Sequence, residues 1–539
     1  MDANLHQLSQ ERAVQLNKEK AMYELQGHIS FSDYHQTGRP FFTLRVILTL
    51  IFVLLSANAF AQKTPNFSKA DALIRSQVAS GTPSIAIAVA RHGTIIWQEA
   101  VGLANREGHV PATIHTPYYL ASVSKTITAT ALMKLVDDGK IDFDKPVNDY
   151  LGDAKLSSQM WNPSEATILR MATHTAGLTT YDRSCNVYSP NCSTDTNDLI
   201  RRYGVIVRQP GDHFDYSNAD YGILGQVVAH SSGVDFGDLL NEQVFMPLGM
   251  QECFLDSNLQ RMRTAAARYD SSRPNEQMSR ERSTTPGASS MYCSVHDLAL
   301  FGMFHLKDHI RGQRQVLSDH SIEEMQKALV STGDGEQYGL GWWIEEHMNG
   351  YRGVLAQGGT SDATAYLQLI PSEDIAVAML WNSGTPDGSK VIDEVLAAML
   401  PRYREALMHV SSPSISSPPV PVKPTESLIG TWSGSIHTYK EDLPLVLSID
   451  PSGGGSVKLG SEPEVHVAYF RFGRNMVKCE VHGPPRLGDT GPDPYGIDIK
   501  LYLHGASLIG AARTGTLPPS KDGTLLFYST KLQKQIAAK

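Results

Sequence analysis

Ser122 and Lys125 are the two residues of this chain whose types and spacing most directly suggest chemistry. Residues three positions apart in a helix lie on one face, about 4.5 Å apart along its axis. A serine hydroxyl is a poor nucleophile unless a neighbouring group takes its proton, and an amine one turn away can do so. A helix N-terminus would add free N–H groups and partial positive charge beside a developing oxyanion. Alone, so short a pattern recurs by chance and more often reflects a serine that caps a helix beside a solvated lysine.

Three other stretches carry polar residues where helices or strands are expected to begin or end. A Tyr-Ser-Asn run places Tyr216 and Asn218 in a loop before a helix, and His174 opens a His-Thr-Ala-Gly-Leu turn after an earlier helix. The stretch Gln357–Thr360 follows a short apolar strand. Each has an ordinary structural use as well, since Tyr216 could be a core tyrosine and Asn218 a helix N-cap.

Taken together and in this order, the motifs resemble the serine β-lactamase and penicillin-binding protein family, in its class C and DD-peptidase-like branch. That branch also contains esterases and D-amino-acid peptidases. The resemblance covers residues 67–405, and the stretches that match it beyond the motifs are 116–129, 146–151, 245–250 and 338–342.

The resemblance implies a role for each residue that matches a family motif. Ser122 would be the acylated nucleophile and Lys125 its proton-accepting neighbour. Tyr216 would carry a proton to and from the leaving group, and Asn218 would hydrogen-bond Lys125 and the substrate. In relatives the turn of His174 mostly supports the fold, so we expect a structural role there. No cofactor and no metal are implied.

The strand stretch supplies the remaining contacts that the resemblance implies. The oxyanion would lie between the backbone N–H groups of Ser122 and Thr360, with Gln357, Gly358 and Gly359 beside the substrate. Relatives usually carry Lys or His where this chain has Gln357. Lysine and tyrosine have reference pKa values of about 10.4 and 10, and Gln357 brings no charge that would favour a tyrosinate. An uncharged amide also holds a substrate carboxylate less strongly, so we expect an ester or amide without that group.

Hydrophobic periodicity indicates the elements that must position these residues. A helix is expected over 68–79, an antiparallel hairpin over 85–89 and 95–97, and an apolar helix over 122–138 that ends at Gly139. Helices and long loops follow over 145–320, including 168–173, 221–230, 236–244 and 295–305. Strand patterns return over 338–344, 353–357, 363–370 and 375–381, before a helix over 391–404.

Strands at both ends of a helical middle predict one sheet completed by distant parts of the chain. The expected fold class is therefore α/β (α+β), an antiparallel sheet flanked by helices with a helical subdomain of β-lactamase/transpeptidase-like type. A small all-β, barrel-like accessory domain should follow, because residues such as 497–503 alternate between polar and apolar. The predicted parts are 1–61 (extension and signal peptide), 67–405 (hydrolase), 406–427 (Pro/Ser linker) and 428–535 (β domain).

Composition and the N-terminal region limit the compartment and the partners. The 539 residues carry a net charge of −9, which gives no electrostatic reason to expect nucleic acid, so the partner would be a small-molecule or peptide substrate. Arg45, an apolar run over 46–55 and small residues up to Ala61 resemble a secretory signal peptide. We expect translation to start nearer Arg45 and the mature chain to begin at Gln62, without a stable membrane span. An uncleaved membrane anchor is the alternative.

The five cysteines show no paired C-x-x-C spacing, so no zinc site is predicted. Cys185 and Cys192 are close enough for a disulfide-closed loop in an oxidising compartment, and two free thiols are equally consistent.

The sequence thus favours a periplasmic or secreted serine hydrolase that cleaves an ester or amide, peptides and β-lactams included, through an acyl-enzyme on Ser122. The alternative is a low-turnover covalent penicillin-binding or sensor protein, or an inactive scaffold with a binding β domain.

Overall fold

The structure is a computed structural model. It describes residues 65–181, 183–186, 194–273, 276–333, 335–384, 388–409, 423–467, 470–482, 487–488, 495–516 and 525–535. The expected signal peptide, Cys192 and most of the Pro/Ser linker lie outside the described residues, so these predictions stay untested. Residues 66–539 form one compact unit.

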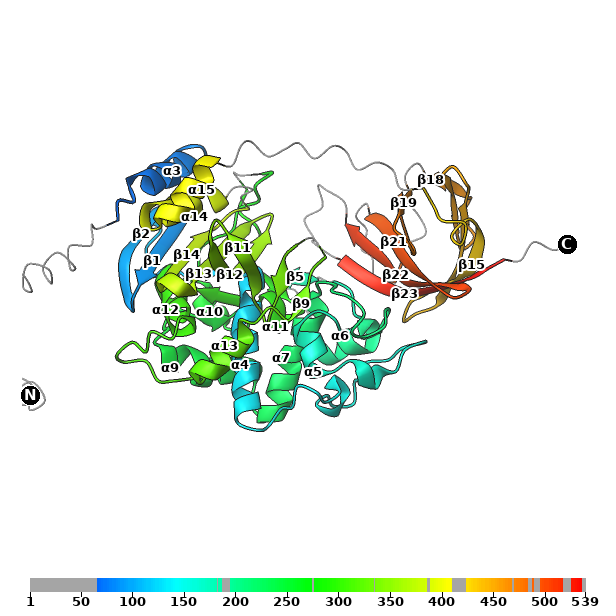
Figure 1. Ribbon diagram of the computed structural model, residues 1–539, viewed down its shortest axis with the longest axis horizontal. Coiled ribbons are helices and arrows are strands. Elements are labelled where there is room, and N and C mark those ends of the chain that lie inside the picture. The colour runs from blue at the N-terminus through cyan, green and yellow to red at the C-terminus, as the bar shows by residue number, and fades with distance from the viewer. Residues whose placement is uncertain are drawn as a thin grey trace, which may run out of the picture. The chain divides into compact units, whose positions relative to one another are not determined.

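A nine-stranded antiparallel sheet organises the first part of this unit, in the order β3-β2-β1-β14-β13-β12-β11-β10-β9 (Figure 1). β1 (Ser84–Arg91) pairs with β14 (Ile375–Trp381), so that Ala88 lies opposite Ala378. The sheet is therefore completed by segments nearly 300 residues apart, which confirms the expected topology. The other strands are β2 (Thr94–Asn105), β3 (Val110–Pro111), β9 (Val330–Ser331), β10 (Gln337–Tyr338), β11 (Trp343–Met348), β12 (Tyr351–Thr360) and β13 (Ala363–Ile370).

The prediction of one continuous strand over 338–344 is wrong. β10 ends at Tyr338 and β11 begins at Trp343, with a turn between them. Gly341 explains the break, because its φ is +80° and a Cβ there would lie 2.9 Å from the Cβ of Ala129. Only glycine allows the turn to approach the helix of Ala129 so closely.

Helices cover both faces of the sheet because β1 buries alternate residues on opposite sides. Ile85, Ile87 and Val89 pack against α3 (Ser68–Ala79), α14 (Ser389–Met399) and α15 (Pro401–His409). Ala86, Ala88 and Ala90 belong to the core on the other side, to which α4 (Ser124–Asp137) and α12 (Val295–His305) contribute. The near-continuous apolar strand is thus buried from both sides, as expected.

The prediction of a single helix over 391–404 is wrong, because this stretch is divided between α14 and α15. Leu400, between them, is extended, with φ −120° and ψ 106°. Pro401 has no N–H to donate and disfavours a helical conformation in the residue before it. The expected helix over 236–244 likewise divides into α8 (Phe236–Leu240) and the π-helical turn η4 (Asn241–Phe245).

The middle of the chain is mostly helical, as predicted. α4 follows a 3₁₀ turn, η1 (Ala121–Val123), and 11 of its 14 residues are buried, so it runs through the core. The remaining helices are α5 (Ile168–Ala172), α6 (Thr196–Tyr203), α7 (Asn218–Ser232), α9 (Met246–Leu248), α10 (Leu259–Met262), α11 (Pro286–Ser289) and α13 (Asp319–Met325). Short strands β4 (Tyr118–Tyr119), β6 (Phe254–Leu255) and β8 (Met291–Cys293) pair in one small sheet, and β5 (Ser184–Asn186) with β7 (Glu281–Ser283) in another.

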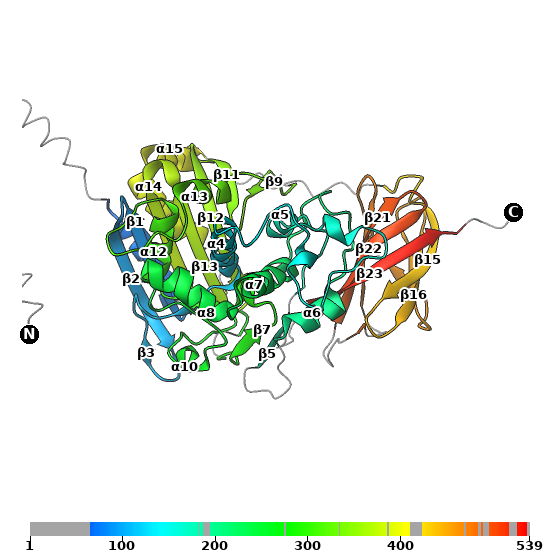
Figure 2. The ribbon, with the colours of Figure 1, turned by 90° about the horizontal axis from the view of Figure 1, so that it is seen from below.

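The C-terminal part is a second nine-stranded antiparallel sheet, barrel-like and in the order β18-β17-β16-β15-β23-β22-β21-β20-β19 (Figure 2). Alternate burial along β20 and β21 gives it an apolar inner face, as the polar–apolar alternation predicts. Its strands are β15 (Gly430–His437), β16 (Asp442–Ile449), β17 (Gly455–Leu459), β18 (Val465–Val467), β19 (Phe470–Phe472), β20 (Met476–His482), β21 (Tyr495–His504), β22 (Ser507–Thr516) and β23 (Leu525–Lys534).

A disulfide between Cys253 and Cys293 joins the residue before β6 to the end of β8. Sequence analysis missed it because 40 residues separate the two cysteines and no spacing rule pairs them. Cys185 is disulfide-bonded as well, and its expected partner Cys192 lies outside the described residues. Cys479 is a buried free thiol. Within the described ranges, no helix is both long and apolar enough to cross a bilayer.

Candidate active site

Ser122 lies in the 3₁₀ turn η1 at the entrance of α4. It is half-buried, whereas its neighbours Ala121 and Val123 are buried. Ala121 has a φ of +44°, a left-handed conformation that is costly for a residue with a Cβ. The surrounding structure holds this strained residue, because the N–H of Leu120 donates to the carbonyl of Met291 in β8 at 2.9 Å. Strain of this kind is typical of functional sites, where packing fixes a side chain in one orientation.

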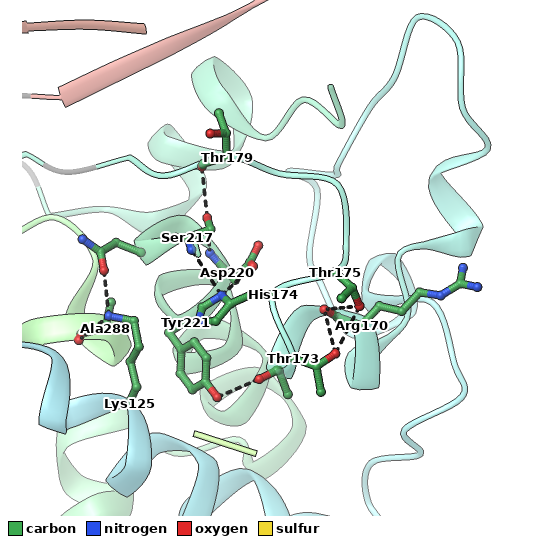
Figure 3. Close-up of polar contacts among 12 residues, drawn as sticks. Lys125, Arg170, Thr173, His174, Thr175, Thr179, Ser217, Asp220, Tyr221 and Ala288 are labelled. Atoms are coloured by element: carbon green, nitrogen blue, oxygen red, sulfur yellow. Dashed lines mark hydrogen bonds and ion pairs between the residues drawn. The ribbon is translucent and has the colours of Figure 1, made fainter. Parts of the chain in front are cut away.

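Lys125, one turn further along, is 1% exposed and places its ammonium group among three acceptors. Nζ lies 3.0 Å from Ser122 Oγ and 2.7 Å from Asn218 Oδ1. It also lies 3.2 Å from the carbonyl oxygen of Ala288 (Figure 3). An ammonium group has three hydrogens to donate, and burying its charge is costly unless they are used. The three acceptors therefore suit the charged form and fix Nζ directly beside the serine hydroxyl.

The start of α7 brings Tyr216 and Asn218 to the same place. Ser217 is the N-cap, and its Oγ accepts a hydrogen bond from the N–H of Asp220 at 3.2 Å. Because Ser217 caps the helix, the cap role considered for Asn218 is wrong and its amide is directed to Lys125. The Lys125 Nζ lies 4.7 Å from the centre of the Tyr216 ring, which also stacks on Trp343 at 6.0 Å. Ser122, Lys125, Tyr216 and Asn218 thus converge.

β12 forms the opposite side of the site and touches the turn of Ser122. A Cβ at Gly358 would lie 2.2 Å from the carbonyl oxygen of Leu120 and 2.7 Å from the backbone nitrogen of Ser122. No side chain fits in that space, so glycine is required for the strand to lie against the nucleophile turn. The next residues, Gly359 and Thr360, are exposed at the end of the strand.

Thr360 and Gln357, on either side of the two glycines, make different polar contacts. Thr360 Oγ1 donates a hydrogen bond of 2.6 Å to Asp362, which pairs in turn with Arg268 at 3.4 Å. Gln357 is exposed and its Nε2 donates to the hydroxyl of Tyr366 at 2.8 Å. Gln357 lies inside β12, not after a strand as expected, and it contributes only a neutral amide.

Sequence reasoning missed two members of this site. The carbonyl of Ala288 is a backbone group, so no residue type could reveal its contact with Lys125. Trp343 stacks on Tyr216 from β11, and the two rings meet only through tertiary packing, because Tyr216 lies in the loop before α7. The only signal in the sequence was that this tryptophan directly follows the stretch 338–342, which matches the family.

The comparisons with known proteins agree with this geometry. A family model described as Beta-lactamase matches residues 70–399, which is more than half of the chain. The chain belongs to the β-lactamase family. In this family member, the match spans every strand of the first sheet and includes every residue of the site described above.

Curated relatives of this chain are distant in sequence. The putative penicillin-binding protein PbpX of Bacillus subtilis is 25% identical over 278 residues, which are 50% of this chain and 63% of PbpX. Penicillin-binding protein 4 of Amycolatopsis lactamdurans is 25% identical over 65% of this chain and 93% of its own length. The esterase EstB of Burkholderia gladioli is 33% identical over 31% of this chain and 45% of its own. These relatives include both penicillin-binding proteins and an esterase.

Solved structures share the fold. The octameric penicillin-binding protein homologue from Pyrococcus abyssi has a TM-score of 0.54 at 20% identity and covers 87% of this chain and 100% of its own. A class C β-lactamase from Rhodobacter sphaeroides has a TM-score of 0.50 at 20% identity, with 61% of this chain and 99% of its own covered. At such low identity, these likenesses establish the architecture alone.

Proposed function

We propose that this chain is a serine hydrolase that cleaves an ester or amide through an acyl-enzyme on Ser122. The observation that carries the proposal is the position of the buried Lys125 ammonium group. It contacts the Ser122 hydroxyl at 3.0 Å and the Asn218 amide at 2.7 Å, and it lies 4.7 Å from the centre of the Tyr216 ring. Membership of the β-lactamase family, with both penicillin-binding and esterase relatives, supports the same reaction class.

The proposed reaction runs in two halves. Ser122 Oγ attacks the carbonyl carbon, and its proton passes within the Lys125–Tyr216 pair to the oxygen of Tyr216 in its tyrosinate form, since the Lys125 ammonium group has no lone pair. The oxyanion lies between the N–H groups of Ser122 and Thr360. Tyr216 then gives a proton to the leaving group as its bond to the carbonyl carbon breaks. In the second half, water attacks the acyl-enzyme, loses a proton to the same pair and releases the acid, while Ser122 regains its hydrogen.

Gln357 favours a substrate without a carboxylate next to the reacting bond. Its amide hydrogen bond to Tyr366 is neutral, and charge-assisted hydrogen bonds hold carboxylates much more strongly. We therefore propose simple esters or amides before β-lactams or D-alanyl peptides. The same observation favours the second candidate, a protein that is acylated on Ser122 and turns over slowly, because an uncharged residue at 357 adds nothing that would favour a tyrosinate.

Export to the periplasm or the medium is part of the proposal. The Cys253–Cys293 disulfide supports it, because disulfides persist in oxidising compartments and are rare in the cytosol. N-terminal sequencing of the mature protein should find Gln62 or a close neighbour, and a chain that retains residue 2 would contradict cleavage.

A fluorophosphonate serine probe tests the nucleophile. Wild-type protein should be labelled, Ser122→Ala should not, and Ser257→Ala, which changes an exposed serine elsewhere, should be labelled as wild type. Turnover of a p-nitrophenyl ester by the wild type would distinguish a hydrolase from a protein that remains acylated. Labelling of Ser122→Ala at the wild-type rate would contradict the proposal.

A further inference from the structure

A buried pair behind the site, His174 and Asp220, has no part in the reaction proposed above. Both side chains are at most 1% exposed, and Nδ1 of His174 lies 3.0 Å from Oδ2 of Asp220 (Figure 3). His174 has a φ of +56°, so the turn after α5 is held in a costly conformation. Its carbonyl oxygen accepts a hydrogen bond from the N–H of Asp215 at 2.8 Å, next to Tyr216. The turn therefore holds the residues that lead into Tyr216.

The hydrogen bonds around Nδ1 indicate which group of this pair carries the proton. The backbone N–H of Ser217 points at the same Nδ1, at 3.2 Å. A backbone amide can only donate, so Nδ1 must present its lone pair to Ser217. Asp220 Oδ2 can then approach this nitrogen favourably only if the oxygen carries a hydrogen. The geometry thus corresponds to a protonated Asp220 that donates to a neutral imidazole, whose own hydrogen is on Nε2.

The surroundings favour the same neutral state. Burial raises the pKa of Asp220 well above its usual range, and the nearby carboxylate of Asp215 adds to this while Lys125 opposes it. Burial lowers the pKa of His174 well below its usual range, and the positive charge of Lys125 lowers it further. The other groups that face the pair are the rings of Phe214, Tyr216, Tyr221 and Tyr338.

We infer that Asp220 and His174 form a neutral acid–imidazole pair that positions Tyr216 and Asn218 for the acyl-enzyme reaction. The inference rests on the proposed function, because it assigns a task within that site. Three contacts carry it: the ring of His174 lies 4.6 Å from that of Tyr216, its Nδ1 holds the N–H of Ser217, and the Asp220 N–H is bound by the Ser217 cap. Ser217 is held from the other side as well, since its Oγ donates to the carbonyl of Thr179 at 3.0 Å.

The neutral state of the Asp220–His174 pair matters as much as its position. An ionised carboxylate at 220 would place a negative charge beside Tyr216, and this would oppose loss of the tyrosine proton. A protonated imidazole would add a second positive charge close to Lys125. The neutral pair fixes the chain on both sides of Tyr216 and leaves the effect of the Lys125 charge on that ring unopposed.

Asp220→Asn and Asp220→Ala separate this inference from a plain structural role. The Asn amide can donate to Nδ1 at every pH, so Asp220→Asn should keep kcat within about threefold of wild type and give an overlapping pH–rate profile. Asp220→Ala removes the donor and should lower kcat by about 100-fold with KM unchanged, because loss of alignment affects the reacting groups and not substrate contacts. A displaced profile in Asp220→Asn would mean that Asp220 is ionised and would overturn the inference, even if Asp220→Ala does not fold.

Infrared difference spectroscopy detects a protonated carboxyl group at Asp220 directly and needs no substrate. At pH 8, wild type minus Asp220→Asn should show a carboxylic-acid C=O band. Asp256→Asn is the matched control, because the pKa of that buried carboxyl is raised only to about 6 and its removal at pH 8 should remove no such band. Absence of the band in the Asp220 difference would overturn the neutral pair. If the band is present but the serine probe never labels Ser122, the proposed function fails and the protonation state stands.

Discussion

The two sides of the candidate site are built in opposite ways. On the helical side (Ser122, Lys125, Tyr216 and Asn218), Lys125 is buried and the other three residues are half-buried. The Lys125 ammonium group donates hydrogen bonds to Ser122, to Asn218 and to the carbonyl of Ala288. The strand side (Gln357–Thr360) touches the nucleophile turn through the buried Gly358, while Gln357, Gly359 and Thr360 are exposed. A buried network of hydrogen bonds tolerates little change, whereas exposed residues can vary at low cost. We infer that the helical side determines the reaction and the strand side selects the substrate.

Among the substitutions that test this comparison, removal of the Lys125 charge should have the largest effect on kcat. Lys125→Met keeps the buried volume but leaves Asn218 Oδ1 and the carbonyl of Ala288 without their donor, at a cost of about 1–3 kcal/mol each. Because the positive charge beside Ser122 and Tyr216 no longer favours proton transfer to Tyr216, kcat for a p-nitrophenyl ester should fall about 1,000-fold.

The control for this substitution is Lys134→Met on the same helix. Lys134 is partly exposed and pairs with Asp138 at the end of α4, so its loss should leave kcat close to the wild-type value. If Lys125→Met retains more than a tenth of the wild-type kcat, the helical side does not determine the reaction.

Gly358→Ala should have a smaller effect, and it tests whether the strand side depends on contact with the helical side. The new Cβ would meet the backbone of Leu120 and Ser122 at 2.2 and 2.7 Å, so β12 or the nucleophile turn must move. We expect a destabilisation of about 1–3 kcal/mol and a loss of kcat of about 100-fold.

Gly359→Ala is the matched substitution for stability, since nothing lies within 4 Å of the position that a Cβ would take there. Thermal unfolding of both variants measures the difference. Equal unfolding temperatures for Gly358→Ala, Gly359→Ala and wild type would show that the close approach is not needed for the fold.

The sequence predicted the architecture well because hydrophobic periodicity reports which faces are buried. It predicted one sheet completed by distant parts of the chain, which the β1–β14 pair confirms, and the buried α4, since these are long apolar segments. It failed where one residue overrode the pattern, as at Gly341 between β10 and β11 and at Pro401 between α14 and α15. It also missed contacts that only tertiary structure creates, namely the Ala288 carbonyl, the Trp343 stack and the Cys253–Cys293 bond.

His174 shows why a motif alone is insufficient. The His-Thr-Ala-Gly-Leu turn indicated a structural residue, and its burial and its bond to Asp215 agree with that interpretation. Nothing in the sequence paired it with Asp220, 46 residues later, because the two meet only through the packing of the turn on α7. The protonation state of the pair follows from the Ser217 N–H, which is a backbone group without any sequence signature.

Gln357→Lys should have the smallest effect and bears most directly on substrate selection. A cation at this exposed position could hold a substrate carboxylate by a charge-assisted hydrogen bond, which is roughly twice as strong as a neutral one. Acylation by a chromogenic cephalosporin should therefore rise about tenfold, which corresponds to about 1.4 kcal/mol, while hydrolysis of an uncharged p-nitrophenyl ester changes little.

Gln357→Leu separates charge from the loss of the hydrogen bond to Tyr366, because it removes that bond and adds no charge. If Leu and Lys accelerate acylation equally, the gain comes from freeing Tyr366 and not from electrostatics. If Lys accelerates neither substrate at any pH near neutrality, selection does not depend on charge at this position. A faster acylation seen only in Gln357→Lys, and only with the carboxylate-bearing substrate, would show that the two sides of the site have separate tasks. The reaction on the helical side would then be unchanged, while the strand side would accept a wider range of substrates.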